Sequence, residues 1–289
     1  MGNGTAVWHR WGVLRLAGAR LLDDRDRAGV RAVLDDDPVA ACMVSARVEV
    51  AGLDPWRLGG ELWAVGPRFD GLCFSGANLV PLRGDRSALR SFADRARRHG
   101  RTCSSLVGRA ELVLPLWDDL ASHWAPAREV RADQPLMVLA GAPAVEPDPY
   151  VRPVHPAELD NYLPAAVAMF TEEVGIDPRL GDGGTGYRAR VAELVSAGRA
   201  FARFENGEVV FKAEIGALSG KVGQIQGVWV HPDRRGHGLG TAGTAAVAAR
   251  LAAMGRVSSL YVNGFNHVAR AAYTRIGFTQ IGSFATVLF

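Results

Sequence analysis

The sequence predicts a mixed α/β (α+β) fold organised as two domains. Segments with the alternation of strands and segments with the 3.6-residue period of helices follow one another along the whole chain. Three prolines within residues 141–149 separate two such series, because prolines this close together cannot continue a helix or a central strand. A chain of 289 residues can fill one or two cores. We therefore expect domains over residues 1–140 and 150–289, joined by a Pro-rich linker.

Composition and charge exclude several classes of partner. The net charge is only +3, and no Lys/Arg-dense run with interleaved aromatic residues occurs, so no nucleic-acid partner is expected. The three cysteines, Cys42, Cys73 and Cys103, lack metal-ligand spacing, which predicts no metal site and favours reduced thiols in a cytoplasmic protein. No run of eighteen apolar residues exists, so no membrane partner is expected. The oligomeric state stays open.

The first domain is expected to alternate helices and strands without a glycine-rich turn. Its apolar spacing predicts helices over residues 25–34, 85–99 and 111–123, and strands over residues 41–50, 61–65, 72–75, 104–107 and 136–139. Gly84 stands alone at the point where a glycine-rich turn would precede a helix. Nothing in this half therefore indicates an anion site.

The second domain shows the same alternation. Its pattern predicts strands over residues 150–154, 200–204, 209–218 and 258–262, and helices over residues 156–173, 187–197, 241–254 and 266–276. Asn206-Gly207 between two of these strands is a strong hairpin signal. The glycine-rich segment 177–185 is long enough to border a substrate cleft.

Residues 226–241 are the most informative stretch of the chain. They begin as the end of a buried strand, and Pro232 ends that strand because proline cannot donate to a ladder. The pattern Arg235-x-x-Gly238-x-Gly240 follows and leads directly into an Ala-rich helix. A helix entered in this way directs unpaired N–H groups and the positive end of its dipole into the turn, and glycines let a ligand reach the backbone. A ligand that carries phosphate is expected here.

The next helix adds a second group of residues. Asn266 and Tyr273 share one face of it, and Gly277-Phe278 follows. Together with the glycine-rich turn, these residues resemble the GNAT superfamily of acetyl-CoA-dependent N-acetyltransferases. The resemblance covers residues 150–289 and implies a mixed, mostly antiparallel sheet flanked by helices. The first half repeats the order of elements without the glycine signature, so we interpret it as a degenerate GNAT-like domain of unknown role in a tandem protein.

The resemblance implies acetyl-CoA as co-substrate and assigns its contacts. The pantetheine arm is expected along the strand edge at residues 228–230, where a backbone N–H of Val228 or Trp229 polarises the thioester carbonyl. Pyrophosphate is expected on the N–H groups of the turn, with Arg235 adding charge. The expected coenzyme-binding residues are Val228, Trp229, Val230, Arg235, Gly236, His237, Gly238, Leu239, Gly240, Thr241 and Asn266.

Tyr273 is the candidate catalytic residue, as the acid that protonates the departing sulfur. Two alternatives stay open, because Tyr273 is also typical of a packed core aromatic and Asn266 is equally typical of a helix cap. For the general base, the carboxylates Glu172, Glu173 and Glu214 are candidates, although each is also typical of a solvated surface charge.

These observations predict an N-acetyltransferase that transfers an acetyl group to a primary amine of a small molecule or peptide by direct attack in a ternary complex. The alternative from another class is a non-catalytic acyl-CoA-binding sensor. A nucleotide-phosphate binder is disfavoured because the turn lacks the Lys-Ser/Thr of a P-loop.

Overall fold

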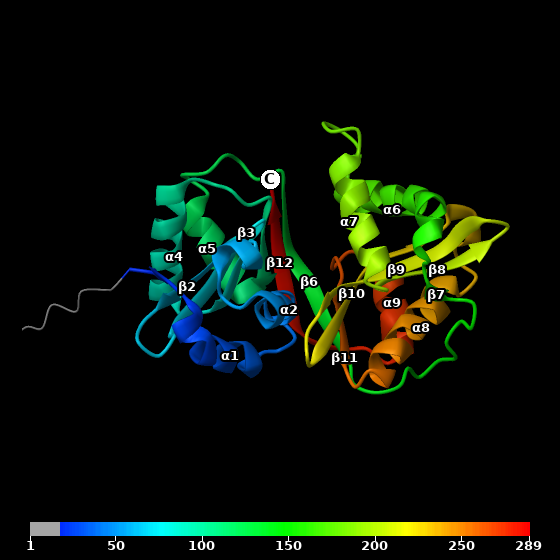
Figure 1. The fold of residues 1–289 in the computed structure, drawn as a ribbon, viewed down its shortest axis with the longest axis horizontal. Helices are drawn as coiled ribbons and strands as arrows, with labels where there is room; N and C mark the ends of the chain where they lie inside the picture. Colours follow the sequence, from blue (N-terminus) through cyan, green and yellow to red (C-terminus); the bar gives the residue numbers. More distant parts are fainter. Residues whose placement is uncertain (1–17) are drawn as a thin grey trace, which may run out of the picture.

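The strands of the computed structural model form one twelve-stranded sheet with helices on both faces (Figure 1). The structure describes residues 18–289. The strand order is β1-β2-β3-β4-β5-β12-β6-β11-β10-β9-β8-β7. Among these neighbours the pairs β4–β5 and β10–β11 are parallel and the others antiparallel. The predicted mixed, mostly antiparallel sheet flanked by helices is confirmed.

The two halves repeat one order of elements: a strand, two helices, three strands, a helix, a strand, a helix and a strand. In the first half these are β1 (Arg20–Leu21), α1 (Arg27–Asp36), α2 (Cys42–Ala51), β2 (Gly60–Val65), β3 (Gly71–Gly76), β4 (Asn78–Arg83), α4 (Arg86–His99), β5 (Ser105–Arg109), α5 (Ala110–Leu120) and β6 (Glu129–Leu139), with the short additional helix α3 (Pro55–Leu58) before β2.

In the second half the same series is β7 (Arg152–Pro153), α6 (Leu159–Val174), α7 (Thr185–Ser196), β8 (Ala200–Glu205), β9 (Glu208–Leu218), β10 (Val222–Val230), α8 (Leu239–Ala253), β11 (Val257–Tyr261), α9 (His267–Ile276) and β12 (Thr279–Leu288). The 3₁₀ turns η1 (Asp24–Asp26), η2 (Pro156–Glu158) and η3 (Pro232–Arg234) precede α1, follow β7 and follow β10.

The two halves exchange their last strands. Strand β6, the last of the first half, lies between β11 and β12, with Leu136 opposite Tyr261. Strand β12, the last of the second half, lies between β5 and β6, with Leu288 opposite Ser105. These two strands cross the middle of the molecule in Figure 1. The exchange joins the halves through backbone hydrogen bonds into one continuous sheet.

The core of the second half consists of two layers, one on each face of the sheet. Because successive strand residues point to opposite faces, Phe211, Ala213 and Ile215 pack with α8 and α9, whereas Lys212 and Glu214 point to the other face. Helices α6 and α7 cover that other face together with Trp229. Both faces of β9 are buried, which places two charged residues in the interior.

The prediction of a strand over residues 41–50 is wrong, because this segment forms helix α2. Its β-branched residues suggested a strand, but Val44 and Val48 are one helical turn apart and both are buried. Helix α2 also packs against the second half, where Cys42 Sγ lies 3.3 Å from the backbone oxygen of Val222. Tertiary contacts therefore outweigh the local strand preference.

Three strands were not predicted, the two-residue β1 among them, and one is longer than expected. Strand β4 contains Pro81, which argues against a central strand, and the structure places it beside a register shift. Strand β12 was not predicted either, and β6 begins at Glu129 rather than near residue 136. Both β6 and β12 are strands through partners from the other half, which local patterns do not reveal.

The predicted hairpin turn and the small buried cysteines are confirmed. Asn206 and Gly207 have positive φ values of 51° and 83°, as a tight hairpin requires. All three cysteines are free and buried. The Pro-rich segment runs along the second half, with the Asp148 N–H donating to the Ala242 oxygen at 3.0 Å. Within residues 18–289, no helix is long and apolar enough to cross a membrane.

Candidate functional site

Strands β10 and β11 separate in the middle of the second half and leave a strand edge open. They pair only from Val222 to Gln224 on β10 and from Val257 to Ser259 on β11. Beyond this point β10 continues to Val230 beside β9, while Tyr261 of β11 pairs with β6. The edge of β10 from Ile225 onward that faces β11 has no strand partner within the described residues. It can accept an extended ligand through backbone hydrogen bonds.

A β-bulge lies on this open edge. Gln226 is opposite Glu214 and Trp229 is opposite Lys212, so three steps along β10 correspond to two along β9. The extra residue is accommodated at Gly227, whose φ is +57°. A Cβ added at Gly227 would lie 3.2 Å from Lys212 Nζ, so the site favours glycine on two counts.

The chain leaves β10 through η3 and enters α8 through the predicted glycine-rich turn. Gly236 and Gly238 have φ values of +78° and +81°, and a Cβ added at either would meet no atom within 4 Å. Gly238 is the N-cap of α8 and provides no side-chain cap. The first turn of α8 (Leu239, Gly240 and Thr241) therefore presents N–H groups and the positive end of the helix dipole to open space. The residues fit a pyrophosphate group.

Arg235 was expected to add positive charge at the pyrophosphate site, but its side chain contacts Val230 and Glu172 instead. Its Nε donates to the Val230 oxygen at 3.0 Å and its guanidinium pairs with Glu172 Oε2 at 2.7 Å. The indole N–H of Trp229 donates to the other oxygen of Glu172 at 2.9 Å. Glu172 of α6 thus contacts both Trp229, before the turn, and Arg235, within it. The positive charge of Arg235 is paired with Glu172 in this structure. His237 is exposed, with Nδ1 2.8 Å from the Arg235 oxygen.

Asn266 and Tyr273 lie on α9, which packs against α8. Asn266 caps α9, since its Oδ1 accepts from the Ala269 N–H at 3.0 Å. Tyr273 is 8% exposed, packs in the α8–α9 core and meets the edge of Phe278. Burial, and secondarily the charge of Glu173, raise the pKa of Tyr273. The Tyr273 hydroxyl is therefore protonated throughout the physiological pH range and can donate a hydrogen bond.

Glu214 is buried, which corrects its interpretation as a surface charge. It is 4% exposed, and its Oε1 accepts from Lys212 Nζ at 2.5 Å and from the Tyr162 hydroxyl at 3.1 Å. Gln226 Nε2 lies 3.4 Å from the other oxygen. Burial alone would raise the pKa of Glu214, but the charge of Lys212 and these hydrogen bonds outweigh it and lower the pKa. Glu214 is thus a structural anion beneath the bulge.

Glu173, at the C-terminal end of α6, is the third candidate carboxylate. About half of its side chain touches solvent (51%), yet the partial loss of hydration raises the pKa of Glu173. Its charge acts on the hydroxyls of Tyr261 and Tyr273. Arg131 of β6 donates to the Glu173 backbone oxygen at 2.7 Å and lies 4.0 Å from the carboxylate. A strand of the first half thus holds the end of α6 that carries Glu173.

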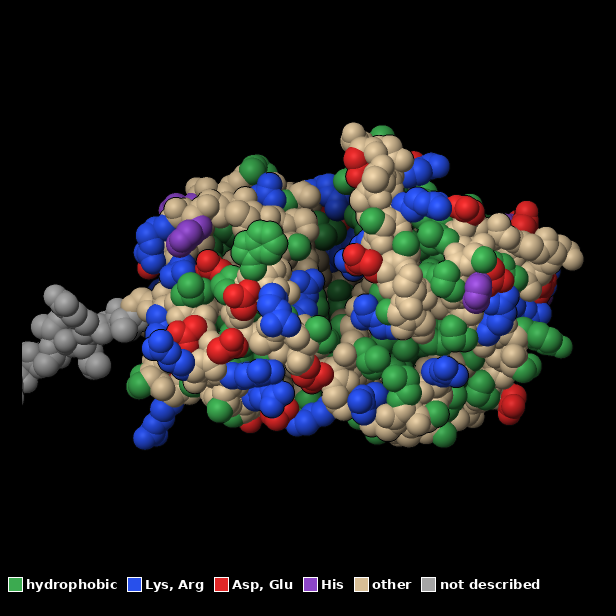
Figure 2. Space-filling view, viewed as in Figure 1, with side chains coloured by type: hydrophobic (Ala, Val, Ile, Leu, Met, Phe, Trp, Pro, Cys, Tyr) green, Lys and Arg blue, Asp and Glu red, His purple; other side chains and the backbone are tan. Residues whose placement is uncertain are grey.

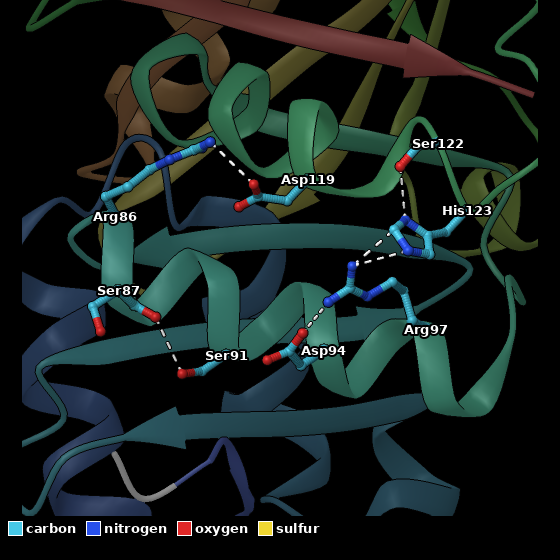
Figure 3. A network of polar contacts seen from close by, with 8 residues as sticks. All are labelled: Arg86, Ser87, Ser91, Asp94, Arg97, Asp119, Ser122 and His123. Carbon is cyan, nitrogen blue, oxygen red and sulfur yellow. Dashed lines mark hydrogen bonds and ion pairs between the residues drawn. The ribbon is translucent and has the colours of Figure 1, made fainter. Parts of the chain in front are cut away.

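The equivalent region of the first half, β4 and the start of α4, differs from the candidate site at the strand irregularity, at the helix N-terminus and at the arginine. The register shift in β4 lies beside Pro81, which has no N–H. Asp85 is the N-cap of α4, and its Oδ1 accepts from the Ala88 N–H at 2.9 Å. Arg86 turns away to α5, where it contacts Asp119 (Figure 3). A carboxylate thus occupies the N-terminus of α4, whereas the equivalent N-terminus of α8 is open.

The predicted site residues divide into two groups. The structure brings together the β10 edge, the glycine-rich turn and the first turn of α8, while Asn266 and Tyr273 lie on the adjoining helix α9. Sequence reasoning missed Gly227, Lys212, Tyr162 and Arg131. A glycine inside a strand signals a bulge, so Gly227 could have been found. The other three come together only in the tertiary fold.

Comparisons with known proteins agree with this geometry. Residues 210–287 match the family model described as FR47-like protein, and residues 60–162 match a domain of unknown function, DUF4081. No curated protein matches the chain in sequence. Among solved structures, a tandem GNAT protein from the clavulanic acid biosynthesis pathway is 16% identical, with 93% of this chain and 98% of that chain covered and a TM-score of 0.50.

The fold is that of a tandem GNAT protein. A GNAT-family acetyltransferase from Colwellia psychrerythraea is 11% identical, with 94% of this chain and 99% of that chain covered and a TM-score of 0.53. A Drosophila protein is 13% identical, with 94% and 98% covered and a TM-score of 0.64. All three structures align with nearly the whole chain, and two of them are described as GNAT proteins. The FR47-like match adds sequence similarity in the second half. The resemblance to the GNAT superfamily is confirmed.

Proposed function

We propose that the chain is an acetyl-CoA-dependent N-acetyltransferase that transfers an acetyl group to a primary amine of a small molecule or peptide by direct attack in a ternary complex. The observation that carries the proposal is the continuity of the open β10 edge with the uncapped N-terminus of α8. One surface thereby offers backbone hydrogen bonds for an extended arm and N–H groups for a phosphate.

Two groups of residues bind the coenzyme in this proposal. The N–H groups of Gly236 to Thr241 hold the pyrophosphate, and the absence of Cβ atoms at Gly236 and Gly238 gives it access to the backbone. Val228, Trp229 and Val230 provide the edge for the extended arm. Acetyl-CoA supplies the acetyl group as a thioester. The bulge at Gly227 turns a backbone N–H, from Val228 or Trp229, toward the position where negative charge develops.

Tyr273 stabilises the departing sulfur in this proposal. Its raised pKa lies above that of a thiol, so full proton transfer to a thiolate is unfavourable. The hydroxyl therefore acts mainly as a hydrogen-bond donor. Its contribution lies near the lower end of the range for acid catalysis, about 10²-fold.

Glu173 accepts the proton of the amine. A lysine-like amine with a pKa of about 10.4 costs about 4 kcal/mol to deprotonate near pH 7.4, so such an acceptor needs a base. Glu214 is neutralised by Lys212, and Glu172 is held by Trp229 and Arg235. Glu173 retains a partly solvated carboxylate with a raised pKa, which makes it the stronger base.

The first half, residues 1–140, acts as a scaffold that binds no coenzyme. Asp85 places a carboxylate where a phosphate would lie, and Pro81 lacks the N–H that a carbonyl would need. The first half contributes β6 to the sheet of the second, and Arg131 on that strand holds Glu173. Its role is to shape the acceptor side of the cleft.

Release of free CoA thiol from acetyl-CoA in the presence of an amine panel tests the proposal. We expect amine-dependent release that is lost in Gly238→Val and strongly reduced in Glu173→Gln. Binding of acetyl-CoA without release for any amine would contradict catalysis and favour the acyl-CoA-binding sensor. Thermal stabilisation by ATP and not by CoA would contradict both.

A further inference from the structure

The first half contains a cavity of about 340 Å³ between its sheet and the C-terminal end of α4. The floor of the cavity includes a row of three side chains, Glu61 on β2, Ser75 on β3 and Leu79 on β4, which lie opposite one another across the strands. They share the face of the sheet that α4 covers, where Leu79 is buried. The volume of the cavity falls within the range of small-molecule sites.

This cavity is separate from the coenzyme site and from the equivalent of that site in the first half. The equivalent region is the N-terminus of α4 at Asp85, whereas the cavity lies at the other end of this 14-residue helix, about 20 Å away. The described residues that line it all fall within residues 60–124. Figure 2 shows a hollow between the two halves, but the second half contributes no described residue to the lining of this cavity. The proposed reaction therefore does not account for it.

Contacts between α4 and the segment after α5 hold the wall of the cavity opposite the sheet. Arg97 Nη1 of α4 lies 3.2 Å from His123 Nε2 (Figure 3), and Trp124 is the next residue in the chain. Trp124 lines the cavity and packs edge-on against Phe289, with the ring centroids 5.7 Å apart. The wall is thus fixed by packing before any ligand binds.

Two side chains that line the cavity have free hydrogen-bond acceptors. Glu61 Oε2 accepts from the Trp63 indole at 2.6 Å and from Arg95 at 3.3 Å, whereas Glu61 Oε1 has no partner within residues 18–289. His99 Nδ1 lies 3.0 Å from the Arg95 oxygen, so Nδ1 carries the hydrogen and Nε2 of the neutral ring is an acceptor. The last carbonyl groups of α4 add the negative end of the helix dipole. A ligand here has to donate hydrogen bonds.

Charge and aromatic rings in the cavity favour a cation. Among the described lining residues, Glu61 is the one carboxylate and none is lysine or arginine. Trp63 and Trp124 contribute two indole rings, and indole is the side-chain ring that binds cations best. Glu61 and Trp63 already hold one cation, because the Arg95 guanidinium lies 5.1 Å from the Trp63 ring centroid and donates to Glu61. Arg95 uses only Glu61 Oε2, which leaves Oε1 and the Trp124 ring for a second cation.

We propose that this cavity is a ligand site of the first half and that it binds a small organic cation, a primary alkylammonium. The ammonium donates to Glu61 Oε1 and His99 Nε2, and its charge lies against the Trp124 ring. The alkyl chain covers the apolar part of the lining, which includes Leu79 and Ala96. A primary ammonium is favoured over a quaternary one because the acceptors require N–H groups. The inference does not rest on the proposed acetyltransferase.

The chemistry of the ligand is tested first, by calorimetry on the full chain at pH 7 without acetyl-CoA. The probes are hexylammonium, hexyltrimethylammonium and hexanol, which share one alkyl chain and differ in charge and in N–H groups. We expect hexylammonium to bind at least about tenfold more tightly than either of the others, as one charge-assisted hydrogen bond provides. Any other order of affinities, or no binding of hexylammonium, overturns the proposal.

The place of binding is tested second, with variants of the lining. Glu61→Gln removes the charge and keeps an acceptor for Trp63 and Arg95, and Ser75→Leu fills the floor of the cavity from the sheet. We expect each to weaken hexylammonium binding about tenfold or more, whereas Glu111→Gln, an exposed carboxylate on α5, leaves it unchanged. Should one variant fail to fold, the other decides. Unchanged affinity in the folded variants overturns the site, as does a loss in Glu173→Gln alone, which would place the amine at the candidate active site.

Discussion

Asp85 and Gly238 are the N-cap residues of the equivalent helices α4 and α8, and only Asp85 caps its helix with a side chain. The Asp85 carboxylate accepts the Ala88 N–H at 2.9 Å, so one of the free N–H groups in the first turn of α4 has an internal partner. Gly238 leaves the corresponding turn of α8 open. A carboxylate at a helix N-terminus also repels a phosphate, so the duplicated halves keep one fold and differ in the capacity to bind an anion.

Replacing Gly238 with valine should abolish CoA binding. The φ of +81° strains any β-branched residue by about 1–3 kcal/mol, and the new side chain lies where the phosphate is expected. Gly255, just after α8, is a matched control, because its φ is +68° and a Cβ there also meets no atom within 4 Å. Gly255→Val should lose similar stability and keep its CoA affinity. Calorimetry that finds equal affinities in the two variants would argue against the phosphate site.

Removing the Tyr273 hydroxyl should slow acetyl transfer without unfolding the protein. The ring of Tyr273 packs in the α8–α9 core, and Tyr273→Phe preserves that packing. We expect kcat to fall about 10²-fold, with the acetyl-CoA affinity and the melting temperature almost unchanged. Tyr261→Phe, on the neighbouring strand, serves as the control and should retain most of the activity. A Tyr273→Phe enzyme with the wild-type kcat would leave Tyr273 as a core residue only.

The pH dependence of kcat/KM should reflect the ionisation of Glu173. The base must be ionised, so kcat/KM should fall as the pH falls through the raised pKa of Glu173, above its ordinary value of 4.5. A raised native pKa also means that this group adds stability below pH 4.5 and loses it as the pH rises through the native pKa. Glu173→Gln should therefore lose the acid limb of the rate profile and be no less stable than the wild type at pH 7. Glu172→Gln should keep the limb. An acid limb that persists in Glu173→Gln would assign the base elsewhere.

Removing one member of the Lys212–Glu214 pair should destabilise the protein more than replacing both members with neutral residues. Lys212 is fully buried, so Lys212→Met leaves the Glu214 carboxylate without its cation in the interior. We expect a loss of about 3–5 kcal/mol in the free energy of unfolding, measured with denaturant. Lys212→Met/Glu214→Gln should recover a substantial part of this loss. If Lys212→Met proved as stable as the wild type, the Glu214 carboxylate would have to be reached by solvent, which would contradict its burial.

Much of the second half could be predicted because its signals are local. The hairpin at Asn206-Gly207, the turn at Gly236 to Gly240 and the cap at Asn266 depend on backbone geometry that only a few residue types favour. The candidate coenzyme residues followed from these signals.

The rest depends on partners distant in the sequence. Helix α2 contains strand-forming residues and becomes a helix where it packs on β9 and β10. Strands β6 and β12 exist because each half completes the sheet of the other. Glu214 could not be separated from a surface carboxylate, because its burial depends on α6 and its cation lies two residues away on β9.

Titration of the full chain with acetyl-CoA in a calorimeter tests the central claim most directly. We expect one acetyl-CoA bound per chain, and none in Gly238→Val. The first half should contribute no site, because Asp85 and Pro81 remove the groups that would bind the phosphate and the carbonyl. Two molecules bound per chain, or one that persists in Gly238→Val, would contradict the assignment of coenzyme binding to the second half.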